Sequence, residues 1–204
     1  MSKTVIADDG LVRCGWCSAA PEFLDYHDTQ WGFPTADDYR LFENLCLESF
    51  QSGLSWRTIL NKRENFRVAF CDFNFNEIAE FNHGDLNRLL QDEGIVRHRG
   101  KVEALINNAQ KAQQMVAEYG SLAAFFWGYE PQSQPLSEAQ NASASDLSVR
   151  LSKDLKKLGW KFLGPTTIYA FMQASGLIND HLEACVIQAD VARTLREFKR
   201  PLRK

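Results

Sequence analysis

Residues 85–109, DLNRLLQDEGIVRHRGKVEALINNA, predict two helices joined by a short connection. Before the connection, Leu86, Leu89 and Leu90 recur at the spacing of one helix face. After it, Val102 begins an apolar stripe of period three to four, which is the clearest helical pattern in the chain. This stretch therefore predicts a pair of helices linked by a hairpin-like turn.

The connection between these two helices has features of an anion site. Gly94 and Gly100 allow the backbone to turn sharply and present free amides, which would suit a DNA phosphate together with the start of the next helix. Arg97, Arg99 and Lys101 add positive charge. An ordinary helix–helix turn with a solvated basic face is the alternative, and the glycine spacing alone leaves both interpretations open.

Helical periodicity extends over the chain from Thr35 onward, and no alternating apolar run is long enough to require a strand. Thr35 and Asp38 match a capping box ahead of a helix that runs to about Phe50, and Ser55 is suited to cap the next helix. Further helices are predicted within residues 76–81, 121–127, 147–158 and 165–172, and around His181 and Cys185. The sequence therefore predicts an all-α protein.

The composition is that of a globular protein. The 204 residues are 45% hydrophobic and 24% charged, with a net charge of −3. No apolar run approaches the roughly 18 residues of a membrane span, and the first residues lack the apolar core of a secretion signal. We therefore expect a soluble cytoplasmic protein with no membrane partner. The charge neither requires nor excludes a polyanionic partner, because a local patch matters more than the sum.

Five cysteines in a chain without a secretion signal favour metal binding or free thiols over a disulfide scaffold. His181 and Cys185 lie one turn apart on the predicted last helix, where both could reach one ion. Cys14 and His27 could add a second pair and close a tetrahedral, structural zinc site. A buried cysteine beside a surface histidine is the alternative, and Cys17, in a C-x-x-C pattern with Cys14, is a rival ligand.

Glu48 follows Leu41 and Leu45 on the apolar stripe of its predicted helix. A buried carboxylate is costly, so it must be hydrogen-bonded internally or line a pocket, unless the helix ends or rotates before it. Aromatic side chains are concentrated near the N-terminus and would suit a pocket that stacks a flat heterocycle, although core packing is their usual role. They are Trp16, Tyr26, Trp31 and Trp56.

Together these motifs resemble the type I 3-methyladenine DNA glycosylases of the helix–hairpin–helix superfamily. The resemblance runs in order from about Arg13 to Cys185 and covers most of the chain. It is carried by residues 13–16 (RCGW), 26–28 (YHD), 31–32, 47–48, 53–56 (GLSW), 62–65 (KREN), 94–101, 155–162, 171–174 (FMQA) and 179–181 (NDH). It implies an all-α helix–hairpin–helix DNA glycosylase fold with a zinc-binding lobe formed by both chain ends.

The resemblance also implies how the chain is organised. The expected parts are a flexible N-terminal extension 1–12, a single glycosylase unit 13–187 and a basic C-terminal tail 188–204. Within the unit, a helix–hairpin–helix is expected in 85–109, a linker in 128–145 and the zinc lobe in 13–31 and 146–187. We expect the protein to be a monomer.

The implied activity is hydrolysis of the N-glycosidic bond of 3-methyladenine in duplex DNA, with the free base as product and no lyase step. The family's Zn²⁺ ligands map onto Cys14, His27, His181 and Cys185. Its base pocket maps onto Glu48, Tyr26 and Trp56, with Trp16 and Trp31 nearby. The candidate DNA contacts are Gly53 and Leu54, as a wedge that fills the space of the extruded base, and Gly94, Gly100 and Lys101.

Two other functions remain open from the sequence. A DNA-binding module with the same motifs and no activity is one. A zinc hydrolase that uses His27 or His181 at an open metal is the other, and it requires three protein ligands and a free coordination site.

Overall fold

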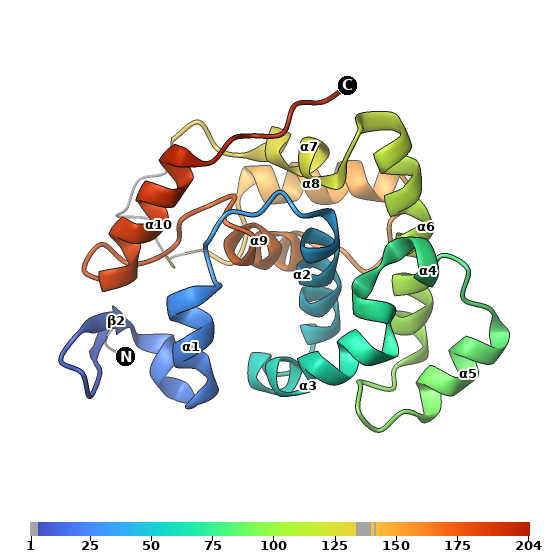
Figure 1. The fold of residues 1–204 in the computed structure, drawn as a ribbon, viewed down its shortest axis with the longest axis horizontal. Helices are drawn as coiled ribbons and strands as arrows, with labels where there is room; N and C mark the ends of the chain where they lie inside the picture. The colour runs from blue at the N-terminus through green and yellow to red at the C-terminus, as the bar shows by residue number, and fades with distance from the viewer. Residues whose placement is uncertain (1–3, 134–139, 141) are drawn as a thin grey trace.

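The computed structural model describes residues 4–133, 140 and 142–204, and these residues are mostly helical (Figure 1). An antiparallel hairpin of β1 (Thr4–Ile6) and β2 (Val12–Cys14) precedes the helices. The α-helices are α1 (Glu22–Thr29), α2 (Asp38–Gln51), α3 (Trp56–Ala69), α4 (Phe75–Ile78), α5 (His83–Gln91), α6 (Arg99–Tyr119), α7 (Leu122–Phe126), α8 (Asp146–Lys157), α9 (Pro165–Ala174) and α10 (Val186–Glu197). The 3-10 helices are η1 (Gly15–Ala19), η2 (Cys71–Phe73) and η3 (Trp127–Tyr129).

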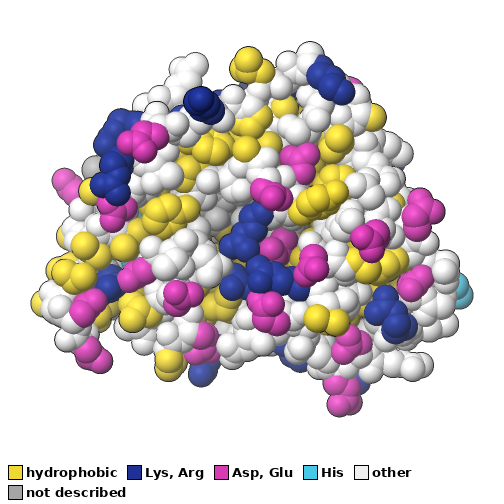
Figure 2. All heavy atoms as spheres, in the orientation of Figure 1, with side chains coloured by type: hydrophobic (Ala, Val, Ile, Leu, Met, Phe, Trp, Pro, Cys, Tyr) yellow, Lys and Arg dark blue, Asp and Glu magenta, His cyan; other side chains and the backbone are white. Residues whose placement is uncertain are grey.

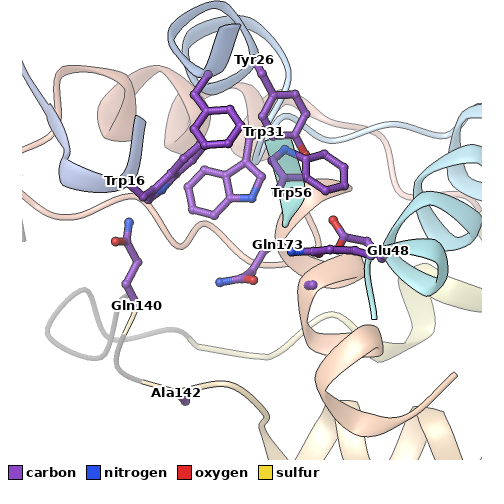
Figure 3. Close-up of a pocket in the computed structure, with 11 residues that line it drawn as sticks. Trp16, Tyr26, Trp31, Glu48, Trp56, Gln140, Ala142 and Gln173 are labelled. Atoms are coloured by element: carbon purple, nitrogen blue, oxygen red, sulfur yellow. The ribbon is translucent and has the colours of Figure 1, made fainter. Parts of the chain in front are cut away.

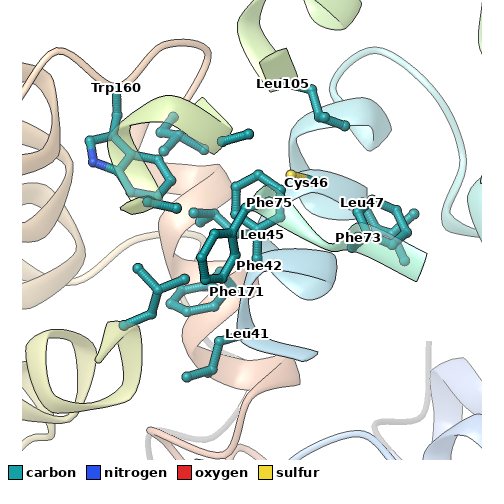
Figure 4. Packing of buried hydrophobic residues seen from close by; sticks show 14 of the residues in the cluster. Leu41, Phe42, Leu45, Cys46, Leu47, Phe73, Phe75, Leu105, Trp160 and Phe171 are labelled. Atoms are coloured by element: carbon teal, nitrogen blue, oxygen red, sulfur yellow. The ribbon is translucent and has the colours of Figure 1, made fainter. Parts of the chain in front are cut away.

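Helix α2 lies at the centre of the fold, packed against α3, α6, α7 and α9 (Figure 1). Its Leu41, Phe42 and Leu45 are fully buried and belong to the same core as Phe171 of α9 and Trp160 (Figure 4). A helix whose apolar residues cover more than one face is a core helix rather than a surface helix. Glu43, Glu48 and Ser49 of α2 are therefore buried with the apolar residues, and each must find a partner or line a cavity.

Helix α2 begins two residues later than the predicted capping box indicates. The carboxylate of Asp37 accepts a hydrogen bond of 2.9 Å from the backbone N–H of Arg40 and caps the helix. Thr35 Oγ1 accepts instead from the N–H of Asp37, at 3.1 Å. The capping box predicted at Thr35 and Asp38 is therefore wrong, because hydroxyl and carboxylate oxygens cap about equally well and neighbouring candidates compete. Asp38 accepts from the N–H of Ala123, which ties α7 to α2.

Other predicted helix starts are confirmed. Ser55 Oγ accepts from the N–H of Thr58 and caps α3, at 3.2 Å. Ser121 Oγ accepts from the N–H of Ala124 and caps α7, at 2.8 Å. Pro165 occupies the first turn of α9, where its missing N–H costs nothing.

The β1–β2 hairpin corrects the prediction of an all-α chain. Val5 pairs with Arg13 in the two-stranded sheet, within and next to the segment that was expected to be a flexible extension. The guanidinium of Arg13 binds the carboxylates of Asp9 and Asp28 at 2.7 and 2.9 Å, which anchors the hairpin to α1. Strands of three residues are too short to produce an alternating pattern in the sequence, so the hairpin is held by these polar contacts.

The helix predicted around His181 and Cys185 is wrong. Residues 175–185 contain no helix, and Cys185 is instead the residue before α10. Gly176, with φ of +73°, turns the chain after α9 against the backbone of residues 32–34. The His181 N–H then donates to Asn179 Oδ1, and such side-chain bonds replace the helical ladder. This path brings α10 against β2, so a segment near each end of the chain takes part in this contact (Figure 1).

Two sequence expectations lie partly outside the described residues. Positions 134–139 and 141, within the predicted linker 128–145, and positions 1–3 of the predicted extension are not described. Within the described ranges, no helix is long and apolar enough to cross a membrane.

The turn at Gly176 leads to a test of the fold. A Cβ atom at this position would lie 2.5 Å from Pro34 N and 2.6 Å from the carbonyl carbon of Phe33, and both are backbone atoms that cannot rotate away. We expect Gly176→Ala to lower the free energy of unfolding by about 3 kcal/mol or more, because overpacking adds to the cost of a positive φ.

Gly10→Ala is the matched control for this measurement by urea denaturation. Gly10 has a φ of +79°, and a Cβ there would meet nothing within 4 Å, so only the backbone cost of about 1 kcal/mol remains. Equal losses in the two variants would show that the close packing of residues 32–34 on Gly176 does not stabilise the fold.

Candidate active site and metal centre

A pocket of about 400 Å³ lies between α1, α2, α3 and α9, beside η1. Its wall is largely aromatic, and polar groups reach into it from α2 and α9 (Figure 3). The lining residues are Trp16, Phe23, Tyr26, Trp31, Glu48, Gln51, Trp56, Gln140, Ala142, Ala170 and Gln173. An apolar cavity with a few convergent polar groups is the usual form of a site for a small flat ligand.

The four aromatic residues singled out from the sequence meet in this pocket. The rings of Tyr26 and Trp56 lie 5.2 Å apart between centroids, and those of Trp16 and Trp31 lie 5.1 Å apart. Figure 3 shows these rings gathered on one side of the Glu48 carboxyl group. The indole N–H of Trp56 is buried and has no acceptor among the described residues. A buried donor without a partner costs free energy unless a bound ligand or water accepts its hydrogen bond.

Glu48 reaches the pocket from the C-terminal half of α2 and is 7% exposed. Burial raises the pKa of its carboxyl group to about 8. Among the described residues, no hydrogen bond or salt bridge to this carboxyl is recorded. Glu43, one turn and a half earlier on the same helix, is equally buried but binds the guanidinium groups of Arg67 and Arg40 at 2.8 and 3.4 Å. The protein thus neutralises one buried glutamate of α2 with arginines and leaves the other to the pocket.

The hydroxyl of Tyr26 lies in the same electrostatic environment. Burial, and secondly the charge of Glu48, raise the pKa of Tyr26 well above its ordinary value. Tyr26 is therefore neutral at physiological pH, and its hydroxyl group keeps its proton available as a hydrogen-bond donor.

Cys14, His27, His181 and Cys185 form a buried cluster whose potential ligand atoms all lie within 4.8 Å of one another. Cys185 Sγ lies 3.5 Å from His27 Nε2 and 3.6 Å from His181 Nδ1, and Cys14 Sγ lies 3.8 Å from His181 Nδ1. These separations match the edges, about 3.6 Å, of a tetrahedron of nitrogen and sulfur atoms around a bound metal ion. Cys17 is not in the cluster and packs against Ala20 and Phe23 instead.

The groups behind this cluster orient its imidazole rings. His27 Nδ1 lies 2.7 Å from Asp28 Oδ1, and His181 Nε2 lies 3.0 Å from the carbonyl oxygen of Trp31. Each ring therefore turns its other nitrogen towards the cysteines, as histidines do in metal sites. Hydrogen bonding, first from Cys14 and then from His181, holds the pKa of the Cys185 thiol well below its usual range. The cluster could hold a metal ion, since the donor set, its burial and the outer partners all fit one.

A family model for methyladenine glycosylases matches residues 16–188, most of the chain. The chain belongs to the methyladenine glycosylase family. It is 45% identical over 179 residues to the DNA-3-methyladenine glycosylase 1 of Escherichia coli K12, an alignment that covers 86% of this chain and 96% of that protein. It is 40% identical over 177 residues to the DNA-3-methyladenine glycosylase of Haemophilus influenzae, over 85% of this chain and 96% of that protein.

Solved structures of this family share the fold. A crystal structure of 3-methyladenine DNA glycosylase I superposes with a TM-score of 0.79 at 45% identity, over 85% of this chain and 98% of that one. A structure describing 3-methyladenine recognition by the enzyme of Staphylococcus aureus has a TM-score of 0.79 at 40% identity, over 86% of this chain and 96% of that one. The resemblance drawn from the sequence motifs is thereby confirmed at the level of the family.

The loop between α2 and α3 borders the pocket of this family member. Gly53 has a φ of +78°, and Leu54 is 43% exposed, so the loop projects an apolar side chain into solvent. A second cavity joins this loop to Glu48 and Gln51. The structure therefore places Gly53 and Leu54 beside the aromatic pocket.

The connection between α5 and α6 differs in two details from the sequence expectation. The N–H of Gly94 donates to Asp92 Oδ1 at 2.7 Å, so this amide is not free. Lys101 is 7% exposed, and its Nζ donates to the backbone oxygens of Phe50 and Ser52 at 3.0 and 2.6 Å. Burial lowers the pKa of this amine. Lys101 thus points inward and ties the start of α6 to the end of α2.

Sequence reasoning missed the residues that support the metal cluster. Asp28 and Arg13 lie next to His27 and Cys14 in the chain, and Arg13 Nε donates to Asp28 Oδ1 at 3.0 Å. A carboxylate beside a candidate histidine ligand is a signal that could have found this pair. Gln173, which lines the pocket and donates to Asp180, carries no comparable signal in the sequence.

The raised pKa of Glu48 predicts a pH-dependent stability. Its folded-state pKa of about 8 exceeds the ordinary value of 4.5, so the folded protein holds this proton more tightly than the unfolded chain. The contribution of this proton to the free energy of unfolding is fully present below pH 4.5 and is lost as the pH rises through 8. Relative to Glu48→Gln, we expect the wild type to lose on the order of 1.4 kcal/mol per pH unit across this window.

Denaturant unfolding of both proteins at several pH values between 4.5 and 8 measures this difference. Contributions of the other ionisable groups are common to both proteins and cancel in the comparison. A difference in unfolding free energy that stays constant with pH would mean that Glu48 has an ordinary carboxyl pKa.

Proposed function

We propose that this protein is a DNA glycosylase that excises 3-methyladenine from duplex DNA. It hydrolyses the N-glycosidic bond, releases the free base and leaves an abasic site. The observation that carries this proposal is the carboxyl of Glu48, which is buried without a cationic partner and lines one pocket with Tyr26 and Trp56. The names of the relatives, which are DNA-3-methyladenine glycosylases, support the same substrate.

The chemistry of the lesion fits this pocket. Methylation of a ring nitrogen makes the attached purine cationic and already a good leaving group, so the enzyme mainly needs to extrude the base and stabilise the sugar cation. In the empty pocket Glu48 holds a proton near neutral pH, because its pKa is about 8. A cationic purine edge favours the ionised carboxylate, whereas neutral adenine does not. Glu48 thereby discriminates the lesion from normal purines.

The aromatic wall supplies the remaining recognition. Tyr26 and Trp56, tilted at 44° to one another, offer faces on which a flipped base stacks. Trp16 and Trp31 close the pocket behind them. The orphaned indole N–H of Trp56 offers a hydrogen bond to an acceptor atom of the base.

DNA binds to two loops, the α2–α3 loop and the α5–α6 turn, both of which adjoin the C-terminal end of α2. The α5–α6 unit acts as a helix–hairpin–helix through the turn from Gly94 to Gly100, and Leu54 enters the stack that the base vacates. Lys101 acts by holding the Leu54 loop in place, since its Nζ binds Ser52 O. Acidic and basic side chains are interspersed on the face shown in Figure 2, so attraction to DNA is local rather than a property of the net charge of −3.

The cluster of Cys14, His27, His181 and Cys185 holds a structural Zn²⁺ ion. Two thiols and two imidazoles are a donor set typical of closed zinc sites, and four protein ligands leave no coordination position for water. The bound ion would crosslink β2 and α1 to the segment before α10, which makes a zinc lobe from both chain ends. An open-metal hydrolase is not favoured, because all four positions are filled by protein.

Base release from methylated DNA tests the proposed activity. We expect the wild type to release 3-methyladenine and Glu48→Gln to retain only part of this rate, because the leaving group is already activated. Affinity for the free base should fall by at least about tenfold in Glu48→Gln and also in Tyr26→Ala. Chromatography of the released bases and calorimetric titration of 3-methyladenine give these values.

Glu80→Gln is the control, because Glu80 is exposed in the turn after α4 and lies outside the pocket. It should match the wild type in both assays. Absence of base release by the wild type would overturn the proposed activity, and unchanged binding in Glu48→Gln would remove Glu48 from recognition.

Metal analysis tests the zinc proposal. The purified protein should contain one zinc per chain, and Cys185→Ser should lose it together with several degrees of Tm, because metal binding is linked to folding. Cys17→Ser is the matched control, since Cys17 is a buried cysteine outside the cluster, and it should keep the metal. Stoichiometric zinc in Cys14→Ser, with loss in Cys17→Ser, would contradict the proposed ligand set.

A further inference from the structure

Phe162, in the loop between α8 and α9, has a conformation that costs free energy in two ways. Its φ is +58°, in the left-handed region that a bulky side chain rarely adopts, and its aromatic side chain is 49% exposed to solvent. Phe73 has a similar φ of +57°, but it is fully buried against Phe70, so core packing compensates its strain. The ring of Phe162 is only half buried, so packing compensates its strain less than that of Phe73.

The loop around Phe162 is held rigidly by three helices. Asn108 of α6 bonds both the N–H and the carbonyl oxygen of Lys161, at 2.8 and 3.0 Å. Ser49 Oγ of α2 donates to the oxygen of Phe162 at 3.2 Å, and Ser152 Oγ of α8 donates to the oxygen of Leu163 at 2.6 Å. Strained backbone persists where its surroundings over-determine it in this way, and it is concentrated at functional sites.

The ring of Phe162 borders the turn before α6. Its centroid lies 6.2 Å from that of His98, and a Cβ at Gly100 would lie 3.4 Å from Phe162 Cζ. Through Ser49, the same loop contacts the C-terminal half of α2, and Leu54 lies in the loop that follows this helix. Leu54 and Phe162 are therefore two exposed apolar side chains in loops that adjoin the C-terminal end of α2.

We infer that Phe162 is a second apolar contact with duplex DNA, whose ring packs against a sugar and base face next to the site of base extrusion. This inference rests on the proposed glycosylase function and adds a contact outside its base pocket. Lys161, the residue before Phe162, is exposed, and its positive charge favours a polyanion as the occupant. An aromatic face is suited to pack on nucleic acid of any sequence.

Phe162→Asn separates this role from a structural one. Asparagine tolerates a positive φ far better than phenylalanine, so the variant should unfold at the same or a higher temperature than the wild type. Its affinity for a lesion-containing duplex should fall by about tenfold, with a matching loss in kcat/KM for base release. Its affinity for free 3-methyladenine should be unchanged, because Phe162 does not line the pocket.

Val68→Asn is the matched control. Val68 is 84% exposed on α3, and valine and asparagine have similar helix propensities, so this change removes an exposed apolar side chain at little cost. It should leave duplex affinity unchanged.

The result that would overturn the inference is a Phe162→Asn variant whose duplex affinity, expressed per folded molecule, equals that of the wild type. Equal affinity would overturn the inference whether or not the variant is less stable, and this result would leave the proposed glycosylase function intact. Failure of the wild type to release base is the separate outcome that would overturn the proposed function.

Discussion

The carboxyl group of Glu48 is buried on the central helix without a cationic partner. Burial of an ionised carboxylate costs desolvation free energy, and the organisation of the pocket depends on how this cost is compensated. The same helix neutralises Glu43 with Arg40 and Arg67, so the fold has the means to compensate a buried glutamate and does not use them at Glu48. Protonation meets the cost in the free protein, which is why the pKa rises to about 8. A cationic base would meet it in the complex. We propose that selectivity for an alkylated purine follows from the burial of this one side chain.

The metal cluster and the pocket share a wall. Within the cluster, Cys14 precedes Trp16 by two residues and His27 follows Tyr26, and the carbonyl of Trp31 accepts from His181. Any movement of the cluster would therefore move the aromatic rings that line the proposed base pocket. This explains why a metal ion that takes no part in the chemistry would still matter for recognition, since it would fix side chains drawn from both ends of the chain.

Much of this arrangement could be predicted from the sequence. The spacing of apolar residues predicted α2 and α6, and the position of Glu48 on the apolar face of α2 predicted a pocket. Both predictions depend only on the local periodicity of the sequence. Three features could not be predicted in this way. The β1–β2 hairpin is too short to show a pattern. Residues 181–185 have helical spacing, but the turn at Gly176 and the Asn179 side chain impose another path. Lys101 looked like a surface cation, but the carbonyls that bind it lie some fifty residues away in the chain.

The most direct measurement is the pKa of Glu48 itself, from a ¹³C NMR titration of the glutamate carboxyl carbons, with the Glu48 resonance assigned by its absence in Glu48→Gln. The account predicts a carboxyl that titrates near pH 8 in the free protein, well apart from the exposed glutamates. A resonance that titrates near pH 4.5 would show that Glu48 is ionised in the empty pocket. It would contradict the claim that burial alone prepares this side chain for a cationic base.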